Sequence, residues 1–256
     1  MSALQIHQFA CLDDNYGYLL HDPDAGLTAS IDSPDAAAIE RELAARGWKL
    51  DYILNTHHHA DHAGGNLALK ARTGCSIVGA RADADRIPGI DVLVGEGHSF
   101  ALGKHNARII ETPGHTRAHI CYLFEADRAA FVGDTLFSMG CGRLFEGTPT
   151  QMWASLQKIT QLPDETRIYC AHEYTQSNGR FALSLEPDSP ALQARIREVA
   201  TLRAAGQPTV PSTLGTEKAT NPFLRPASPE LRARLGLATA TDTEVFAETR
   251  RRKDQF

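Results

Sequence analysis

A run of histidines inside the chain is the first feature that could do chemistry. Four of the eleven histidines fall within the segment 55–62, which reads NTHHHADH and also carries Asp61. Neutral imidazole and carboxylate are ligands that suit zinc, and also iron or manganese. The run is internal and interrupted, whereas a purification tag is an unbroken run at a terminus. The segment therefore predicts a metal site rather than a solvated polar loop.

Later segments offer further ligands of the same kind. Three apolar, strand-like runs each lead to one metal-competent side chain just past their ends, as the run Tyr52–Leu54 leads into the histidine cluster. These side chains are His115, Asp134 and His172. In a layered α/β protein such positions can converge at one edge of a sheet. Each residue alone could be a surface histidine or a turn aspartate, but four strand ends of this kind favour a shared site.

The number of candidate ligands points to more than one ion. The set of five histidines and two aspartates is larger than one tetrahedral ion can use. It consists of His57, His59, Asp61, His62, His115, Asp134 and His172. His57 and His59 point the same way on an extended backbone, so His58 between them should point away. We predict two adjacent ions, with Asp134 as the bridging carboxylate and His58 outside the ligand set.

Hydrolysis is the chemistry expected of such a pair of ions. A water held between two dications loses a proton near neutral pH and becomes a strong nucleophile. We therefore predict hydrolysis at a carbonyl or phosphoryl centre, with Asp61 and Asp134 as catalytic carboxylates. The sequence contains neither a Gly-x-Ser-x-Gly nucleophile elbow nor a phosphate-cradling P-loop.

Composition limits the partners and the compartment. The 256 residues suit one large domain or a domain with an appendage, and the net charge of −5 argues against a general nucleic-acid-binding surface. No apolar run approaches the roughly 18 residues of a membrane span, and the first residues do not resemble a signal peptide. The five scattered cysteines predict free thiols. We expect a cytoplasmic monomer without nucleic-acid or membrane partners.

Strand and helix patterns alternate in the first half of the chain and place the histidine cluster between a strand and a helix. Ser33 should cap, and Pro34 should open, a helix that Gly47 stops. The last part of the chain is mostly helical, with helices predicted over 192–202 and 243–252. The pattern predicts helices packed on sheet faces, followed by a small helical appendage.

The histidine cluster also resembles a known motif. Thr56-His57-x-His59-x-Asp61-His62 resembles the metal-binding motif of the metallo-β-lactamase superfamily, and the three later candidates match its remaining ligands. Within that superfamily the chain is most similar to the glyoxalase II (hydroxyacylglutathione hydrolase) family, essentially from end to end. The segments that carry this narrower resemblance are 15–16, 112–116, 133–137, 140–143, 145–148, 171–175, 221–225 and 250–256.

The resemblance implies a fold and a reaction. The expected fold is α+β, an αββα metallo-β-lactamase sandwich as catalytic domain over residues 1–172, with a helical substrate-binding domain over 173–256. The expected reaction is hydrolysis of S-D-lactoylglutathione, and of other S-2-hydroxyacylglutathiones, to glutathione and a 2-hydroxy acid. This is the second step of methylglyoxal detoxification.

The resemblance also assigns roles to residues. It implies two divalent metal ions, Zn²⁺ first and iron or manganese as alternatives. One ion would bind His57, His59 and His115, the other Asp61, His62 and His172, with Asp134 bridging. The substrate contacts would be Arg143, Tyr174, Arg250 and Lys253. Two positions depart from some family members, which have tyrosine where this chain has Phe145 and lysine where it has Arg143.

Other functions remain open at this point. The alternatives are another hydrolase of the superfamily (a lactonase, a β-lactamase or another thioesterase), a persulfide dioxygenase with one iron, or a non-catalytic metal-stabilised binding module. A flavodiiron oxidoreductase would carry a carboxylate in place of His59. Arg250 and Lys253 share a helical face and could grip one carboxylate, but the basic tail could also be a solvated helix end.

Overall fold

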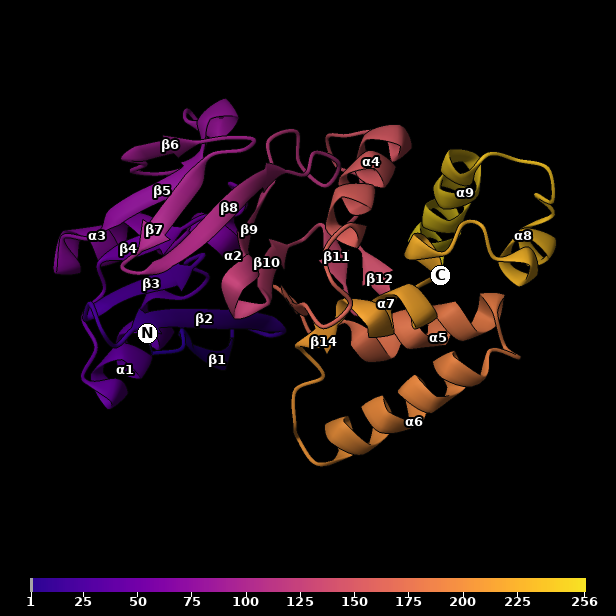
Figure 1. Cartoon of the computed structure of the whole chain (residues 1–256), viewed down its shortest axis with the longest axis horizontal. Coiled ribbons are helices and arrows are strands. Elements are labelled where there is room, and N and C mark those ends of the chain that lie inside the picture. The colour runs from indigo at the N-terminus through magenta and orange to yellow at the C-terminus, as the bar shows by residue number, and fades with distance from the viewer. Residues whose placement is uncertain (1) are drawn as a thin grey trace. The chain divides into compact units, whose positions relative to one another are not determined.

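The structure is a computed structural model that describes residues 2–256. The chain forms two units, and most contacts lie within one or the other. The first unit holds the residues up to Glu111 together with Ala118–Gly133, and the second holds Thr112–Arg117 with Asp134–Phe256. This division is not the predicted boundary between residues 172 and 173, which stays a prediction. Figure 1 shows the elements of both units.

The first unit contains a mixed sheet whose strands follow one another in chain order, β1-β2-β3-β4-β5-β6. The pairs from β1 to β3 are antiparallel and those from β3 to β6 are parallel. The strands are β1 (Gln5–Cys11), β2 (Asn15–Asp22), β3 (Leu27–Ile31), β4 (Tyr52–Leu54), β5 (Ser76–Ala80) and β6 (Val92–Val94). The carboxyl ends of parallel strands share one edge, so β3 and β4 deliver their following loops to the same place.

Helices α1 (Ala36–Arg46), α2 (Ala60–Ala63) and α3 (Asn66–Thr73) connect these strands. A buried apolar cluster joins α1 and α3 to the sheet, through Ile39, Ile53 and Leu69 among others. Each such fully buried side chain contributes about 1.5–3 kcal/mol. Gly47 ends α1 in the left-handed conformation, as predicted.

The predicted cap of α1 was wrong. The helix begins after Asp35, whose carboxylate accepts hydrogen bonds from the main-chain N–H groups of Ala37 and Ala38. Ser33 lies two residues before this cap, and its hydroxyl donates to Asn66 Oδ1 at 2.6 Å. Aspartate is as favourable a cap as serine, so the helix starts two residues later than predicted.

A second set of strands in the first unit runs antiparallel in the order β10-β9-β8-β7. Aromatic pairs join it face to face with the first sheet. Tyr18 lies edge-on to Phe131, with ring centroids 5.5 Å apart, and Tyr52 to Phe100 at 5.1 Å. The strands are β7 (Ser99–Leu102), β8 (His105–Glu111), β9 (Ile120–Phe124) and β10 (Ala129–Gly133), with 3₁₀ turns η1 (Arg81–Asp83) and η2 (Glu125–Asp127).

The second unit is mostly helical. Its helices are α4 (Pro149–Thr160), α5 (Thr175–Leu185), α6 (Pro190–Ala204), α7 (Leu214–Thr220), η3 (Pro222–Leu224), α8 (Pro229–Leu235) and α9 (Asp242–Asp254). Its strands are β11 (Leu136–Phe137), β12 (Gly140–Cys141), β13 (Arg167–Cys170) and β14 (Ser212–Thr213), paired as β11–β12 and β13–β14. Helices α6 and α9 contain the two segments that the sequence predicted to be helical.

Side chains from the helices hold the β11–β12 hairpin. Asn221 donates to the carbonyls of Phe137 and Gly140, and the buried Glu217 accepts the N–H of Met139 at 2.8 Å. Asn178 donates to the carbonyl of Ser138. The turn therefore has its main-chain groups satisfied although it is buried.

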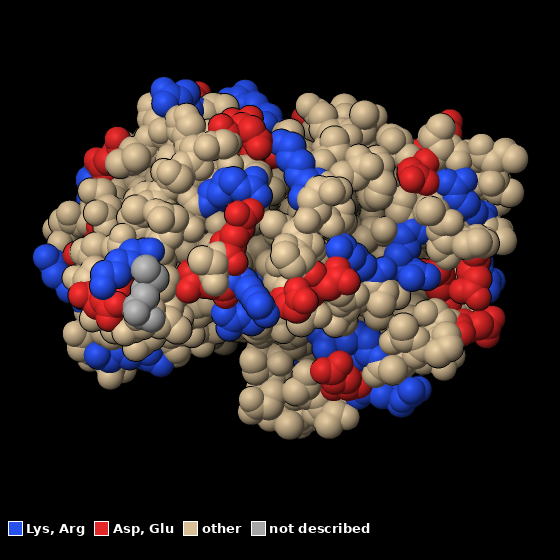
Figure 2. Space-filling view, in the orientation of Figure 1, with Lys and Arg blue, Asp and Glu red and all other residues tan. Residues whose placement is uncertain are grey.

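The surface carries charges of both signs. On the face drawn in Figure 2, basic and acidic side chains alternate in small groups. All five cysteines are buried thiols. Among the residues that the structure describes, no helix is both long enough and apolar enough to cross a membrane.

Candidate metal and substrate site

The histidine cluster lies in the loop that follows β4, in the first unit. The main-chain N–H of Asn55 donates to Val78 on β5, and that of Thr56 donates to Asp32 Oδ1 at 2.7 Å. Helix α2 then starts directly after His59. The loop is thus tied to the strands on both sides, which fixes the backbone that carries the ligands.

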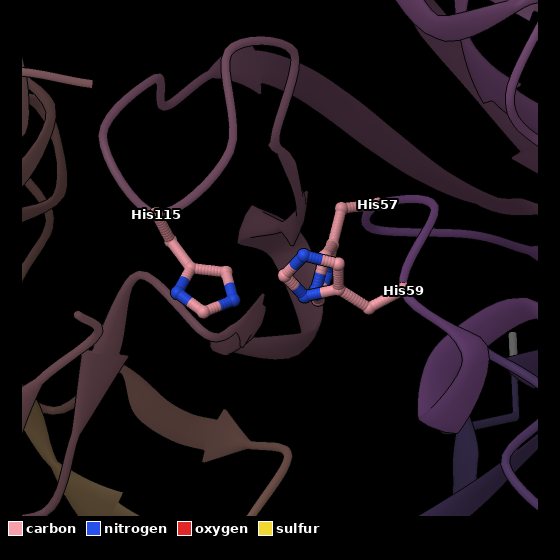
Figure 3. A group of neighbouring side chains, drawn as sticks. All are labelled: His57, His59 and His115. Carbon is pink, nitrogen blue, oxygen red and sulfur yellow. The ribbon is translucent and has the colours of Figure 1, made fainter. Parts of the chain in front are cut away.

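His57 and His59 present their rings to each other, as Figure 3 shows. His57 Nε2 lies 3.0 Å from His59 Nδ1, and His57 Nδ1 lies 3.1 Å from the hydroxyl of Thr56. His57 is fully buried. Two imidazole nitrogens that converge in this way offer their lone pairs to one small region, as the extended-backbone argument predicted.

Asp32 is a residue of the site that the sequence analysis missed. Its Oδ2 lies 2.8 Å from His62 Nδ1 and accepts the Thr56 hydroxyl at 2.8 Å. A carboxylate on Nδ1 fixes the tautomer of His62 and directs Nε2 outward as a ligand atom. Asp32 directly follows strand β3, as Asp134 follows β10, so the same strand-end signal could have found it.

Asp61 and His58 take different positions beside this cluster. The amide of Asn15 donates to Asp61 Oδ2 at 3.4 Å, and the same carboxylate lies 3.5 Å from His62 Nε2. His58 instead contacts Asp83 through Nδ1 at 3.1 Å and Arg86 through Nε2 at 3.2 Å. The two ring nitrogens of His58 therefore face a neighbouring ion pair.

His119 is buried and stacks on the ring of His57, with centroids 4.8 Å apart. Gly133, the last residue of β10, has a φ of +47° and leaves room for this stack. A Cβ atom there would come within 2.7 Å of His119 Nε2 and of the Thr56 hydroxyl. Glycine is required at this position by both the backbone and the close approach.

The remaining three predicted ligands lie together in the second unit. Asp134 is buried, with one carboxylate oxygen 3.4 Å from His115 Nε2 and the other 3.4 Å from His172 Nε2. His115 Nδ1 lies 2.9 Å from the carbonyl oxygen of Arg143, which leaves Nε2 toward the carboxylate. Asp134 therefore faces one histidine from each of its oxygens.

These residues fit a site for metal ions. The rings of His57, His62 and His115 each have Nδ1 beside an oxygen and turn Nε2 toward other candidate ligands. This is the arrangement of ligand histidines whose orientation is set by their outer partners. The donors are imidazoles and carboxylates, without a thiolate, which suits Zn²⁺, Fe²⁺ or Mn²⁺ in an open catalytic site more than a structural zinc.

A cavity of about 460 Å³ in the second unit begins at His115 and Asp134. All four residues predicted to contact substrate line it, with three cations among them. These four are Arg143, Tyr174, Arg250 and Lys253. Tyr174 stacks flat on His172, with centroids 4.8 Å apart, and Phe145 lies edge-on to His115 at 5.2 Å. The aromatic walls thus contact metal-ligand candidates, while the cations come largely from the C-terminal helix.

Arg250 is buried, so the alternative of a solvated helix end is wrong for this residue. Its guanidinium donates to the carbonyl of Cys141 at 2.9 Å and forms an ion pair with Asp254 at 2.8 Å. It also lies over the ring of Phe223, 5.1 Å from the centroid. Only a specific partner offsets the cost of burying a charge, and here a carboxylate supplies it.

Lys253 lies half-buried on α9, against the same cavity. Its ammonium lies 3.4 Å from the hydroxyl of Ser177 and over the rings of Phe181 and Phe256. Burial, and then the neighbouring arginines, lower the pKa of Lys253 to about 8, against the opposing effect of Asp254. The lysine is thus a cation that lacks full compensation and would gain from an anionic ligand.

Comparisons with known proteins identify the family of the chain. A family model described as the metallo-beta-lactamase superfamily matches residues 24–172, and one described as the hydroxyacylglutathione hydrolase C-terminus matches residues 173–256. The hydroxyacylglutathione hydrolase of Maricaulis maris (strain MCS10) is 58% identical over 256 residues, 100% of both chains.

Two solved structures share the fold. The structure of ETHE1 from Myxococcus xanthus is similar with a TM-score of 0.70 and 25% identity, covering 96% of this chain and 90% of that one. TTHA1623 in a di-iron-bound form has a TM-score of 0.62 and 22% identity, covering 86% and 100%. At 22% identity, the similarity to TTHA1623 concerns the fold alone.

The fold is therefore that of the metallo-β-lactamase superfamily, with mixed sheets and helices and a helical C-terminal part, and the predicted fold class is confirmed. Its histidines and aspartates support binding of divalent metal ions. Within the superfamily the chain belongs to the hydroxyacylglutathione hydrolase (glyoxalase II) family, and it is a thioester hydrolase. The predicted family is thus confirmed.

Proposed function

We propose that this chain is a metal-dependent hydrolase of S-2-hydroxyacylglutathione thioesters, with S-D-lactoylglutathione as substrate and glutathione and D-lactate as products. The observation that carries the proposal is the cavity in which His115 and Asp134 lie beside Arg143, Arg250 and Lys253. Ligands for a hydrolytic metal at one part of a cavity, and cations elsewhere in it, suit a substrate with a reactive carbonyl and distant carboxylates.

Two divalent ions per chain form the first part of the proposal. His57, His59 and His115 (labelled in Figure 3) would hold one ion, and Asp61, His62 and His172 the other, with Asp134 between them. When bound, such ions supply Lewis-acid polarisation of the carbonyl and activation of a water. Zinc suits the donors best, and iron or manganese are the alternatives.

The protein's own residues would orient the reaction. Asp32 and Asn15 hold His62 and Asp61 in position, so the ligand atoms need not reorganise during turnover. Tyr174 and Phe145 give the cavity apolar walls beside the ligands, and both are exposed in this structure. A bound thioester would cover these rings and exclude water from them.

We further propose that residues 1–172 form the catalytic domain and 173–256 the substrate-binding domain. The two family models meet between residues 172 and 173, which supports this boundary. The glutathione contacts would come from Arg143, Tyr174, Arg250 and Lys253. A cytoplasmic monomer suits a small-molecule substrate of this kind.

One preparation can test the proposal directly. We expect hydrolysis of S-D-lactoylglutathione, measured as loss of the thioester absorbance. Elemental analysis of the same sample should give two metal ions per chain. Full activity with one ion per chain would contradict the two-ion assignment. Oxygen uptake with a glutathione persulfide would favour a dioxygenase, and turnover of lactones or β-lactams in place of the thioester would favour another hydrolase of the superfamily.

The KM for the glutathione thioester should rise as the pH increases through about 8, because Lys253 then loses its charge. An anionic ligand favours the protonated lysine, so affinity is full below this pH and falls above it. A hydrogen bond to a charged group contributes about 1.5–3 kcal/mol, which corresponds to a roughly ten- to hundredfold change in KM.

The matched variant is Lys253→Ala, with KM measured by initial rates between pH 6 and 9. It should have a high KM that no longer changes around pH 8, while its kcat and metal content stay close to those of the wild type. A KM profile that is the same in both proteins would remove Lys253 from the substrate contacts.

A further inference from the structure

Asp254 is the one acidic side chain in this cavity, among the residues that the structure describes, that is not a candidate metal ligand. It lines the same space as Arg143, Arg250 and Lys253, and it is more than two-fifths exposed. A carboxylate in this place repels any anion that enters, so it opposes the binding of an anionic ligand that the three cations favour. Its contacts give a reason for its presence.

The carboxylate of Asp254 forms an ion pair with the guanidinium of Arg250. Oδ1 lies 2.8 Å from the NH2 nitrogen of Arg250, while the NH1 nitrogen donates to the carbonyl of Cys141. Arg250 is nearly buried, so without Asp254 a charged nitrogen at the cavity would lack an anionic partner. The nitrogen paired with Asp254 is thus the one whose present partner is an anion, and an incoming carboxylate would compete with Asp254 for it.

The two members of this ion pair differ in their freedom to move. Arg250 is held by Cys141 and packed over Phe223, whereas Asp254 is the last residue of α9 and its side chain is 43% exposed. Once a ligand carboxylate pairs with Arg250, Asp254 can rotate into water, because its own side chain is partly exposed. Arg250 cannot leave in the same way.

We propose that Asp254 is an internal competitor for the anion-binding position at Arg250, and that it sets how tightly the cavity holds a carboxylate ligand. The inference rests on the proposed glutathione thioester substrate and deepens it. While the cavity is empty the carboxylate of Asp254 compensates Arg250, and a ligand carboxylate must displace it. The competition weakens binding of both substrate and product, and so favours release of glutathione.

The variant that isolates this effect is Asp254→Asn. It keeps the size of the side chain and an oxygen that can accept from Arg250, but it removes the negative charge. The dissociation constant of glutathione, measured by titration calorimetry on the metal-loaded protein, should fall by roughly 1.5- to fivefold, the range of a partly exposed ion pair. The gain should be larger at low ionic strength, where charges are less screened.

Two control variants separate this role from general effects. Glu248→Gln removes a carboxylate from the same helix, one that pairs with Arg251 and Arg252 and does not line the cavity, so it should leave the dissociation constant unchanged. Asp254→Glu keeps the charge and should bind as the wild type does. Glutathione with its glycine carboxylate esterified should show a smaller difference between wild type and Asp254→Asn.

Equal or weaker glutathione binding by Asp254→Asn, with an unchanged melting temperature, would overturn the proposal, and so would equal tightening by Glu248→Gln. Because the readout is binding, it is independent of turnover. If the wild-type protein binds glutathione but does not hydrolyse the thioester, the proposed reaction is wrong. The titration of Asp254→Asn still tests the role of Asp254 in that case.

Discussion

Replacing Asp134 with alanine should remove metal and activity together. In the second unit this buried carboxylate faces His115 from one oxygen and His172 from the other, each at 3.4 Å. Without it, two dications would face each other with less negative charge between them, and two imidazoles would lose their common partner. Loss of an outer partner of a ligand already weakens metal binding roughly 10–100-fold, so loss of the bridge should exceed about a hundredfold.

The measurement is metal content after dialysis, together with kcat for the thioester. His58→Ala is the matched control, since it also removes a metal-competent side chain from the same part of the sequence. Its ring contacts Asp83 and Arg86, so we expect unchanged metal content. If His58→Ala lost its metal while Asp134→Ala retained it, the ligand assignment would be wrong.

The second large effect is expected for Asp32→Asn. The carboxylate of Asp32 receives the Thr56 N–H, the Thr56 hydroxyl and His62 Nδ1 within 2.8 Å. The asparagine side chain has only one accepting oxygen. Its NH₂ group would face donor groups of Thr56 or His62, with which it cannot form the same hydrogen bonds. Each buried group left unsatisfied costs about 1–3 kcal/mol, and metal affinity should fall by roughly 10–100-fold because the His62 ring is no longer oriented.

Asp83→Asn offers a close comparison, because Asp83 is also buried and also contacts a histidine through Nδ1. That histidine is His58, which is not a proposed ligand. Both variants should lower the melting temperature, but only Asp32→Asn should lower metal affinity in a chelator competition titration. Equal metal affinity in the two variants would show that Asp32 acts on stability alone.

Local signals predicted much of the first unit. Strands β1 to β5 and the end of helix α1 were predictable because alternation and glycine in the left-handed conformation depend on neighbours in sequence, whereas β6 and β7 were not predicted. The start of α1 was predicted two residues too early, because Ser33 and Asp35 are both good caps and the helix uses Asp35, while Ser33 bonds to Asn66. Helix α4 was missed although its capping box, Thr148 with Gln151, is a local signal that the sequence displays.

The sequence by itself determined the ligand chemistry of this protein. Imidazole and carboxylate groups at fixed spacing after strands define which metals suit them, and His57 and His59 face each other because extended backbone turns alternate side chains to one side. These are properties of residue type and of a few neighbouring dihedral angles, so no tertiary structure is needed to see them.

Only the tertiary structure decided which groups support and modulate the site. Asp32 reaches His62 across 30 residues, and Arg250 reaches Cys141 across 109, because separate strands and helices pack against each other there. Burial then decides the electrostatic state, since it lowers the pKa of Lys253 and makes Arg250 require a partner. Distance and desolvation are set by packing, and the spacing of residues along the chain does not encode them.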